Sequence, residues 1–125
     1  MLKEITKKPW GSWEMISSGD GWQVKILRFI PGGALSLQRH QHRSESWCVA
    51  SGTGKAYVAG TGNTWIYPGD TVSVPNKVAH RIENTGSETL VVVETQYGDY
   101  LGEDDLERLE DAYGRTLGKV DPAND

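Results

Sequence analysis

The sequence predicts an all-β fold, a sandwich or barrel of short antiparallel strands in one domain. Runs of β-branched and aromatic residues recur along the chain and are interrupted roughly every eight to twelve residues. Fifteen glycines and five prolines supply most of the interruptions, because these residues favour the backbone conformations of tight turns. With 125 residues, the chain has room for a single domain with a sizeable core.

Seven stretches have the composition of strands. The stretch at 54–59 and the one after it should form a hairpin across the turn Gly60-Thr61-Gly62-Asn63. The predicted strands are residues 22–30, 46–50, 54–59, 64–67, 71–74, 79–83 and 89–96.

The pattern changes near the C-terminus. Acidic residues 103–105 suit the first turn of a helix, and three apolar residues follow at helical spacing: Leu106, Leu109 and Tyr113. We therefore expect one short helix that ends at Gly114, within a domain that covers residues 1–115. The polar residues 116–125 are expected to form a frayed tail.

The overall charge argues against several classes of partner. A formal net charge of −4 gives no general attraction to nucleic acid or to an anionic membrane. The sequence shows no signal peptide and no apolar run long enough for a membrane span. The lone cysteine, Cys48, cannot form an internal disulfide, which agrees with a reducing compartment. We expect a cytoplasmic protein.

The histidines are concentrated in two short segments that also carry other potential metal ligands. His40 and His42 lie in the first segment and His80 in the second. Imidazole is the commonest metal ligand in proteins near neutral pH. Side chains two residues apart on an extended strand share a face, so Gln38 and His40 can bind one ion together. Glu45 and His80 would complete four donors for a divalent cation.

The spacing of these donors resembles the two signature motifs of the cupin superfamily. Gln38 stands in place of the first histidine of one motif, and Lys77 stands in place of the central glycine of the other. The resemblance implies a cupin double-stranded β-helix, a jelly-roll barrel without large insertions. The matching positions are Pro31, Gly32, His40, Glu45, Gly52, Gly69, Pro75, His80 and Asn84.

His42 leaves an alternative open, because residues 38, 40 and 42 would all share one face of a strand. A chelate of His40 and His42 would leave only two residues before Glu45 and would place Ala34 where the motif has a glycine. The register with Gln38 as a ligand fits the motif better. His42 is otherwise interpreted as a catalytic base, a substrate contact or an interior histidine.

Longer sequence motifs narrow the resemblance to one family within the superfamily. Leu101-Gly102-Glu103-Asp104-Asp105 and Tyr113-Gly114-Arg115 are not general cupin features. Together with the words at 8–14, 42–45 and 80–84, they resemble the C-terminal cupin domain of type II mannose-6-phosphate isomerases, which is often fused to a mannose-1-phosphate guanylyltransferase.

The resemblance implies interconversion of mannose 6-phosphate and fructose 6-phosphate with one divalent metal ion. Zn²⁺ is the first expectation, and Mn, Co, Ni or Fe are the alternatives. Related type I enzymes use a Gln, His, Glu, His ligand set, which Gln38, His40, Glu45 and His80 reproduce. Cupin sheets commonly pair through exposed edges, so the resemblance also implies a homodimer.

Two positions depart from the family pattern. The family usually has three consecutive histidines where this chain has His40-Gln41-His42, and a histidine after the glutamate where this chain has Ser46. If either missing imidazole moves protons, activity or substrate choice would differ.

An aldose–ketose isomerase must move a proton between neighbouring carbons through an enediolate, and it needs a base near neutral pKa. His42 is the first candidate for this base and Glu94 is the second. Arg115 lies in one of the family-specific motifs, but a role at the end of the predicted helix or in packing explains it at least as well as a role in the site. The substrate phosphate requires cations, and those that adjoin predicted site strands are Lys25, Arg28, Arg43 and Arg81.

A second hypothesis is a binding protein without turnover. In it, a metal-containing cupin holds a sugar phosphate or a nucleotide sugar during polysaccharide-precursor synthesis. Oxygenase chemistry is disfavoured, because a glutamine ligand donates less electron density than the histidine of oxygenase cupins.

Overall fold

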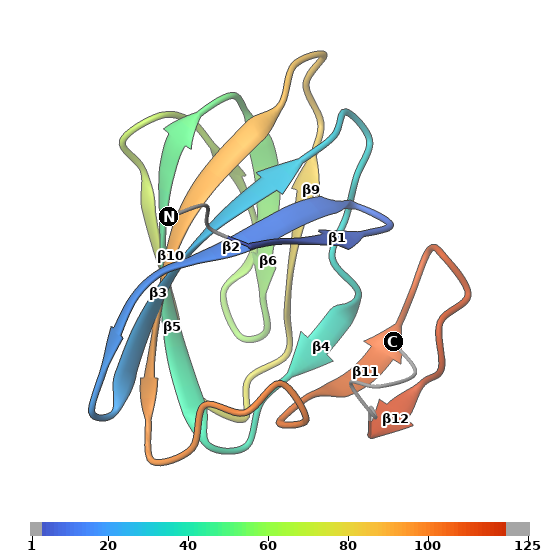
Figure 1. Cartoon of the computed structure of the whole chain (residues 1–125). Coiled ribbons are helices and arrows are strands. Elements are labelled where there is room, and N and C mark those ends of the chain that lie inside the picture. The colour runs from blue at the N-terminus through green and yellow to red at the C-terminus, as the bar shows by residue number, and fades with distance from the viewer. Residues whose placement is uncertain (1–3, 120–125) are drawn as a thin grey trace.

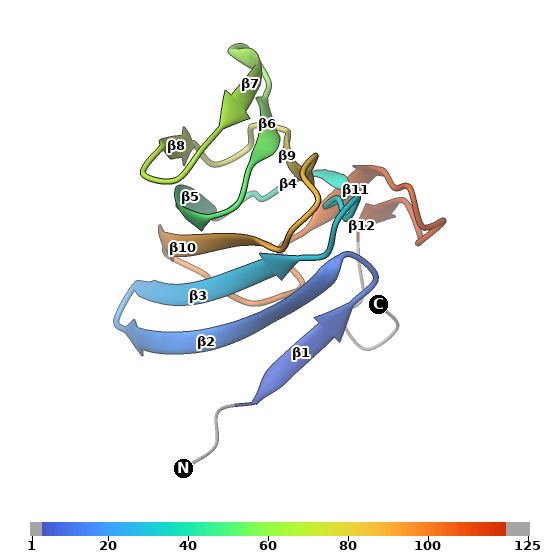
Figure 2. The same ribbon diagram turned by 90° about the horizontal axis from the view of Figure 1, so that it is seen from above.

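The computed structural model describes residues 4–119, which form twelve strands in two antiparallel sheets. The first sheet contains, in spatial order, β1 (Ile5–Lys8), β2 (Gly11–Gly19), β3 (Trp22–Phe29), β10 (Leu90–Gly98), β5 (Arg43–Ser51) and β8 (Thr71–Val74). The second contains β12 (Gly118–Lys119), β11 (Glu107–Glu110), β4 (Leu37–Arg39), β9 (His80–Asn84), β6 (Gly54–Val58) and β7 (Gly62–Ile66). The sheets enclose a common interior (Figure 1 and Figure 2). The predicted all-β barrel is confirmed.

Each predicted strand stretch coincides largely with an observed strand, and β6 and β7 form the predicted hairpin. The seven predicted stretches do not include β1, β2, β4, β11 or β12. The N-terminal hairpin of β1 and β2 extends the first sheet beyond β3, because β2 pairs with β3 along its length.

The barrel interior is apolar at one end and polar at the other. Side chains alternate between the two faces of a strand, and the inward positions of β3, β10 and β5 are buried at every second residue. At the apolar end, Phe29, Leu90 and Val92 are completely buried together with Ile82 from the second sheet. This packed layer fixes the barrel below the polar end.

Strand register gathers the polar inward residues at one place. Gln23 lies opposite Gln96, and Lys25 lies opposite Glu94, across β3 and β10. Gln96 in turn lies opposite Glu45 on β5. Because the strands are antiparallel, the polar half of each meets the polar half of its neighbour. The chemistry of this protein is therefore concentrated at one end of the barrel.

The predicted short C-terminal helix is wrong. Residues 107–110 form β11, which pairs with β4 so that Arg108 lies opposite Gln38. Pairing with the open edge of β4 satisfies the backbone groups that a helix would have satisfied internally. Asp105 does not support a helix N-terminus, because its carboxylate accepts the backbone N–H groups of Gln41 and His42. Among residues 4–119 there is no helix of the length and apolar character needed to cross a bilayer.

The predicted polar tail, residues 116–125, is only partly described. Gly118–Lys119 form β12 and pair with β11, so this part of the tail continues the sheet. Residues 120–125 lie outside the described residues. Figure 1 shows β11 and β12 beside β4, at the edge of the second sheet.

Lys77 adopts the left-handed conformation at the motif position where cupins usually have glycine. Its φ is 69°, and its backbone N–H donates to the carbonyl oxygen of His40 at 2.6 Å. The turn before β9 thereby supports the loop that carries His40. A side chain in this region costs conformational energy, which explains the glycine in the motif.

We expect Lys77→Gly to raise the free energy of unfolding by about 0.5–1 kcal/mol. Relief of left-handed strain, about 1–2 kcal/mol, exceeds the extra entropy that glycine loses on folding, about 0.5–1 kcal/mol. Urea denaturation measures the change. Lys77→Ala is the matched control, because it removes the same side chain and keeps the strain. Equal stabilities of the two variants would contradict this explanation.

Asn84 closes β9 with a fully buried side chain. Its amide nitrogen donates to the carbonyl oxygens of Phe29 and Glu88, and its amide oxygen accepts the backbone N–H of Gly86. The bond to Gly86 lies within the turn that follows β9. One side chain therefore links β9, the end of β3 and the turn before β10.

Asn84→Ala should lower the free energy of unfolding by about 2–4 kcal/mol, because it leaves buried backbone groups without partners. Glu83→Ala is the control at the neighbouring half-buried position, and it should change stability by less than about 0.5 kcal/mol. Both values come from urea denaturation. Similar losses in the two variants would argue against a special role for Asn84.

Candidate metal centre

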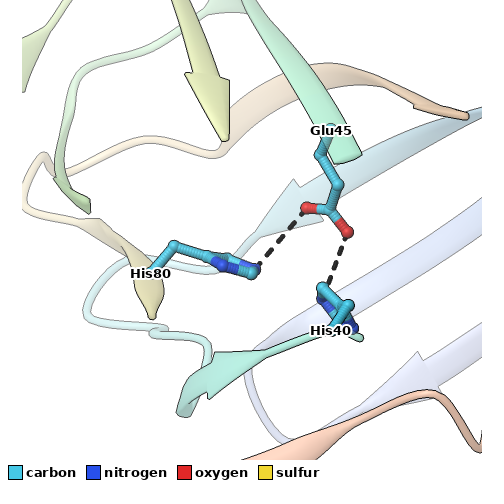
Figure 3. Close-up of side chains that lie close together, drawn as sticks. All are labelled: His40, Glu45 and His80. Carbon is cyan, nitrogen blue, oxygen red and sulfur yellow. Dashed lines mark ion pairs between the residues drawn. The ribbon is translucent and has the colours of Figure 1, made fainter. Parts of the chain in front are cut away.

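Three of the four predicted metal ligands converge at the polar end of the barrel. Glu45 lies on β5, His80 is the first residue of β9, and His40 follows β4. Their side chains point toward one another from these three elements (Figure 3). His40 Nε2 lies 3.2 Å from Glu45 Oε2, and His80 Nε2 lies 3.6 Å from Glu45 Oε1. All three residues are buried, and their ligand atoms lie within 4.8 Å of one another.

The backbone orients both imidazole rings. His40 Nδ1 lies 2.5 Å from the carbonyl oxygen of Asp105, and His80 Nδ1 lies 2.9 Å from that of Val78. A carbonyl oxygen can only accept, so each Nδ1 carries the proton and each Nε2 keeps its lone pair. His80 Nε2 is buried without a hydrogen-bond partner in the part of the chain that the structure describes. Two oriented imidazoles, a carboxylate and an unsatisfied buried nitrogen suit a divalent cation.

Gln38 lies beside this cluster. It is the cross-strand partner of His80 between β4 and β9, so both side chains are on the inner face of the sheet. Its amide oxygen accepts a hydrogen bond from Ser36 Oγ at 2.8 Å. The structure therefore places the fourth predicted ligand next to the other three, with its oxygen held by a neighbouring hydroxyl.

Arg43 supplies positive charge inside the cluster. Its Nε donates to Glu45 Oε2 at 2.9 Å, and its Nη2 lies 3.2 Å from His40 Nε2. Burial alone would raise the pKa of Glu45, but Arg43, His40 and His80 together hold that pKa well below its usual range. Burial lowers the pKa of His80. The ionised form of Glu45 is thus favoured, and a metal ion would compete with Arg43 for Glu45 Oε2 and His40 Nε2.

Glu94 lies next to the cluster on β10 and differs from Glu45 in protonation. The Trp47 indole nitrogen donates to both carboxylates, at 3.1 Å to Glu45 and 3.2 Å to Glu94. Gln96 donates to the other oxygen of Glu94. Burial and the charge of Glu45 raise the pKa of Glu94 to about 8, although Arg43 and Lys25 oppose the shift. Glu94 is therefore suited to accept and return a proton near neutral pH.

Glu94 opens onto a cavity of about 240 Å³. Of the sequence-predicted site residues, Gln38, His40, Glu94, Lys25 and Arg43 line it. The remaining lining residues include three cations that the sequence interpretation did not select as substrate contacts. These are Lys8, Arg108 and Arg115.

The other predicted substrate cations lie elsewhere. Arg28 pairs with Glu14 at 2.6 Å. Arg81 pairs with Glu110 at 3.4 Å and lines a separate groove on the outer face of the second sheet. The sequence could not separate these two from Lys25 and Arg43, because an error of one residue in strand register moves every side chain to the opposite face of the sheet.

His42 lies apart from the other two histidines. Its side chain is 53% exposed, its Nδ1 is 3.5 Å from Asp99, and its ring contacts Tyr100 edge-on. Strand β4 ends at Arg39, so the alternation that would place residues 38, 40 and 42 on one face does not extend to His42. The structure thus brings His40, but not His42, to the cavity.

Both departures from the family pattern lie outside the cavity. Gln41 is exposed in the loop after β4. Ser46 is on the outer face of β5, between the buried side chains of Glu45 and Trp47. Neither departure removes a group from the lining of the cavity.

Comparison with known proteins identifies the family of this chain. The family described as mannose-6-phosphate isomerase C-terminal matches residues 2–111. The alginate biosynthesis protein AlgA of Pseudomonas aeruginosa is 46% identical over 110 residues, 87% of this chain and 22% of that protein. Mannose-1-phosphate guanylyltransferase of Escherichia coli K12 is 39% identical over 109 residues, 87% of this chain and 23% of that protein. The chain thus spans about a fifth of the length of these relatives.

Solved structures agree with the fold. A cupin-2 domain from Rhodospirillum rubrum superimposes with a TM-score of 0.68 at 22% identity, over 82% of this chain and 78% of that one. A putative sugar phosphate isomerase from Acidithiobacillus ferrooxidans has a TM-score of 0.63 at 27% identity, over 78% of this chain and 68% of that one. The barrel is therefore a cupin fold, as the sequence resemblance implied.

The ligand set makes a prediction about metal retention. Gln38→Ala should weaken Zn²⁺ binding at least about tenfold, whereas His42→Ala should leave the affinity close to that of the wild type. Glu45→Gln should weaken binding most, because it removes the anion at the centre of the cluster. Titration against a chelator of known affinity measures all three. A larger loss for His42→Ala than for Gln38→Ala would exclude the proposed register.

Proposed function

The chain belongs to the mannose-6-phosphate isomerase C-terminal family, and we propose that it is a metal-dependent aldose–ketose isomerase acting on mannose 6-phosphate and fructose 6-phosphate. One observation carries the proposal: Glu94, a buried carboxylic acid, opens onto the same cavity as Gln38 and His40. This arrangement supports a role for Glu94 as the proton carrier beside a cluster suited to a divalent cation.

The reaction moves a proton between two neighbouring carbons and shifts the carbonyl by one position. A divalent ion held by Gln38, His40, Glu45 and His80 would polarise the carbonyl oxygen of the sugar. The Glu94 carboxylate accepts the proton from one carbon and returns it to the next. Hydrogen bonds from Trp47 and Gln96 hold this carboxylate in place during both transfers.

Glu94 is favoured over His42 as the base. Glu94 is 4% exposed and faces the cavity, whereas His42 is largely in solvent beside Asp99. A base must come within hydrogen-bond reach of the proton that it removes, and His42 lines a different hollow with Tyr100. The sequence had ranked these two residues in the opposite order.

Lys25 and Arg43 are the sequence-predicted substrate cations that remain in the proposal. Arg43 is held against Glu45 and His40 at the cluster. Lys25 forms an ion pair with Glu103, and its Nζ lies 4.0 Å from the centre of the Trp13 ring. Both cations are adjacent to Glu94 and can hold oxygens of the sugar near it.

The alternative is a binding protein for a sugar phosphate or a nucleotide sugar. It is supported by the competition between Arg43 and a metal ion for Glu45 and His40. If Arg43 keeps its contacts with Glu45 and His40, the metal ion would be held too weakly for turnover, and the metal-containing cupin would only bind its ligand. In either form, the proposal includes the cytoplasm as the location and a homodimer as the assembly.

The full chain, stripped of metal and reloaded with Zn²⁺, Mn²⁺ or Co²⁺, should convert mannose 6-phosphate to fructose 6-phosphate. Glu94→Gln should lower kcat by about 10²–10⁴-fold, the usual contribution of a general base. His42→Gln should lower it by less than about threefold. A coupled assay for fructose 6-phosphate measures each rate.

The outcomes separate the hypotheses. Tight binding of mannose 6-phosphate without conversion by any metal form would support the binding protein instead. Conversion that survives Glu94→Gln but is lost in His42→Gln would restore His42 as the base and contradict the assignment of Glu94.

A further inference from the structure

The cavity beside Glu94 is lined by far more positive than negative charge, although the chain as a whole carries a net charge of −4. Its only carboxylates within the described residues are Glu94 and Glu103. A cluster of cations in a partly closed hollow attracts and orients anions. The five cations that line it are Lys8, Lys25, Arg43, Arg108 and Arg115.

Arg108 continues a row of inward-facing residues that begins at the metal centre. His80, Gln38 and Arg108 are successive cross-strand partners on β9, β4 and β11. Neighbouring strands lie about 5 Å apart, so Arg108 is one strand from Gln38 and two strands from His80. It is 2% exposed, and its Nη1 donates to the carbonyl oxygen of Thr116. A guanidinium is thus fixed at a short distance from the cluster.

Arg115 reaches the same cavity from the loop after β11, and Asp111 holds it there. Its Nε and Nη2 donate to the two oxygens of Asp111 at 3.1 and 3.0 Å. The backbone N–H of Arg115 donates to the same carboxylate. Asp111 thus holds both the backbone and the side chain of Arg115, and its own side chain is 1% exposed. Burial would raise the pKa of Asp111, but Arg115 and Arg108 together lower it.

The loop itself is fastened to the barrel. The backbone N–H of Ala34 donates to the Tyr113 hydroxyl, between Asp111 and Arg115 in the chain. These contacts fix Arg108 and Arg115 before any ligand arrives, which lowers the entropy cost of binding. Guanidinium groups are matched in geometry to phosphate oxygens.

We propose that Arg108 and Arg115 form the phosphate-binding subsite of this cavity and that Asp111 is its positioning residue. The inference rests on the proposed function, because it takes the ligand to be a sugar 6-phosphate. Such a sugar carries its phosphate at the opposite end from the carbons that exchange the proton. The subsite therefore binds the phosphate away from Glu94 while Gln38 and His40 lie near the reacting carbons.

Isothermal titration of the full chain, with and without Zn²⁺, tests the subsite using mannose 6-phosphate, unphosphorylated mannose and inorganic phosphate as probes. Arg108→Gln and Arg115→Gln should each weaken mannose 6-phosphate binding by about 10- to 100-fold, the value of one charged hydrogen-bonded contact. The affinity for inorganic phosphate should fall in parallel. Any affinity for unphosphorylated mannose should stay within about twofold of the wild type.

Arg39→Gln is the matched control, because Arg39 is on β4 next to Gln38 and pairs with Glu107 outside the cavity. It should bind every probe as the wild type does. Asp111→Asn should weaken phosphate binding in the same direction as Arg115→Gln, and Arg115→Lys should recover only part of the affinity. Thermal melting identifies any variant that does not fold. If Arg108→Gln does not fold, the affinities of Arg115→Gln and Asp111→Asn test the subsite in its place.

Unchanged affinity for mannose 6-phosphate in Arg115→Gln would overturn the subsite. Equal losses for mannose and mannose 6-phosphate would also overturn it, because the arginines would then shape the cavity without recognising phosphate. The subsite would also be overturned if the wild-type chain bound neither mannose 6-phosphate nor inorganic phosphate. Arginine-dependent phosphate binding without isomerisation would leave the subsite standing and would overturn only the proposed function.

Discussion

A carboxylate as deeply buried as Glu45 requires compensating positive charge, and much of the polar end of the barrel is arranged around this requirement. Arg43 provides that charge, and His40 and His80 direct their imidazole rings toward the same carboxylate. Trp47 connects the same carboxylate to Glu94. Removal of the paired charge would leave an uncompensated anion, so the cluster is held together by its own electrostatics.

The two carboxylates lie side by side and have opposite protonation tendencies. Glu45 lies against the Arg43 guanidinium and the two imidazole rings, which favour its ionised form. Glu94 is buried next to that anion, which favours its protonated form. Neighbouring acids whose environments separate their pKa values are a recurring arrangement in acid–base catalysis. Here the difference follows from strand position, since Arg43 and Glu45 are on β5 and Glu94 is on β10.

The C-terminal segment completes the site. Its acidic motif, residues 101–105, ends in Asp105. The Asp105 carboxylate accepts hydrogen bonds from the loop after β4, and its carbonyl oxygen orients His40. Beyond it, β11 and the following loop bring Arg108 and Arg115 to the cavity. Asp105 and Arg115 belong to the sequence motifs that resemble the mannose-6-phosphate isomerase family rather than cupins in general, whereas Arg108 lies between these motifs. Their role is spatial, because Asp105 anchors the loop that carries His40 and the two arginines line one side of the cavity.

The sequence by itself determined the all-β class, most of the strands and three candidate metal ligands that the fold brings together, because alternation and motif spacing are local properties of the chain. Tertiary structure decided the remainder. The end of β4 at Arg39 separated His42 from His40, and the open edge of β4 made β11 a strand despite helical spacing. Which cations face the cavity depends on register between strands distant in sequence, and no local pattern contains that information.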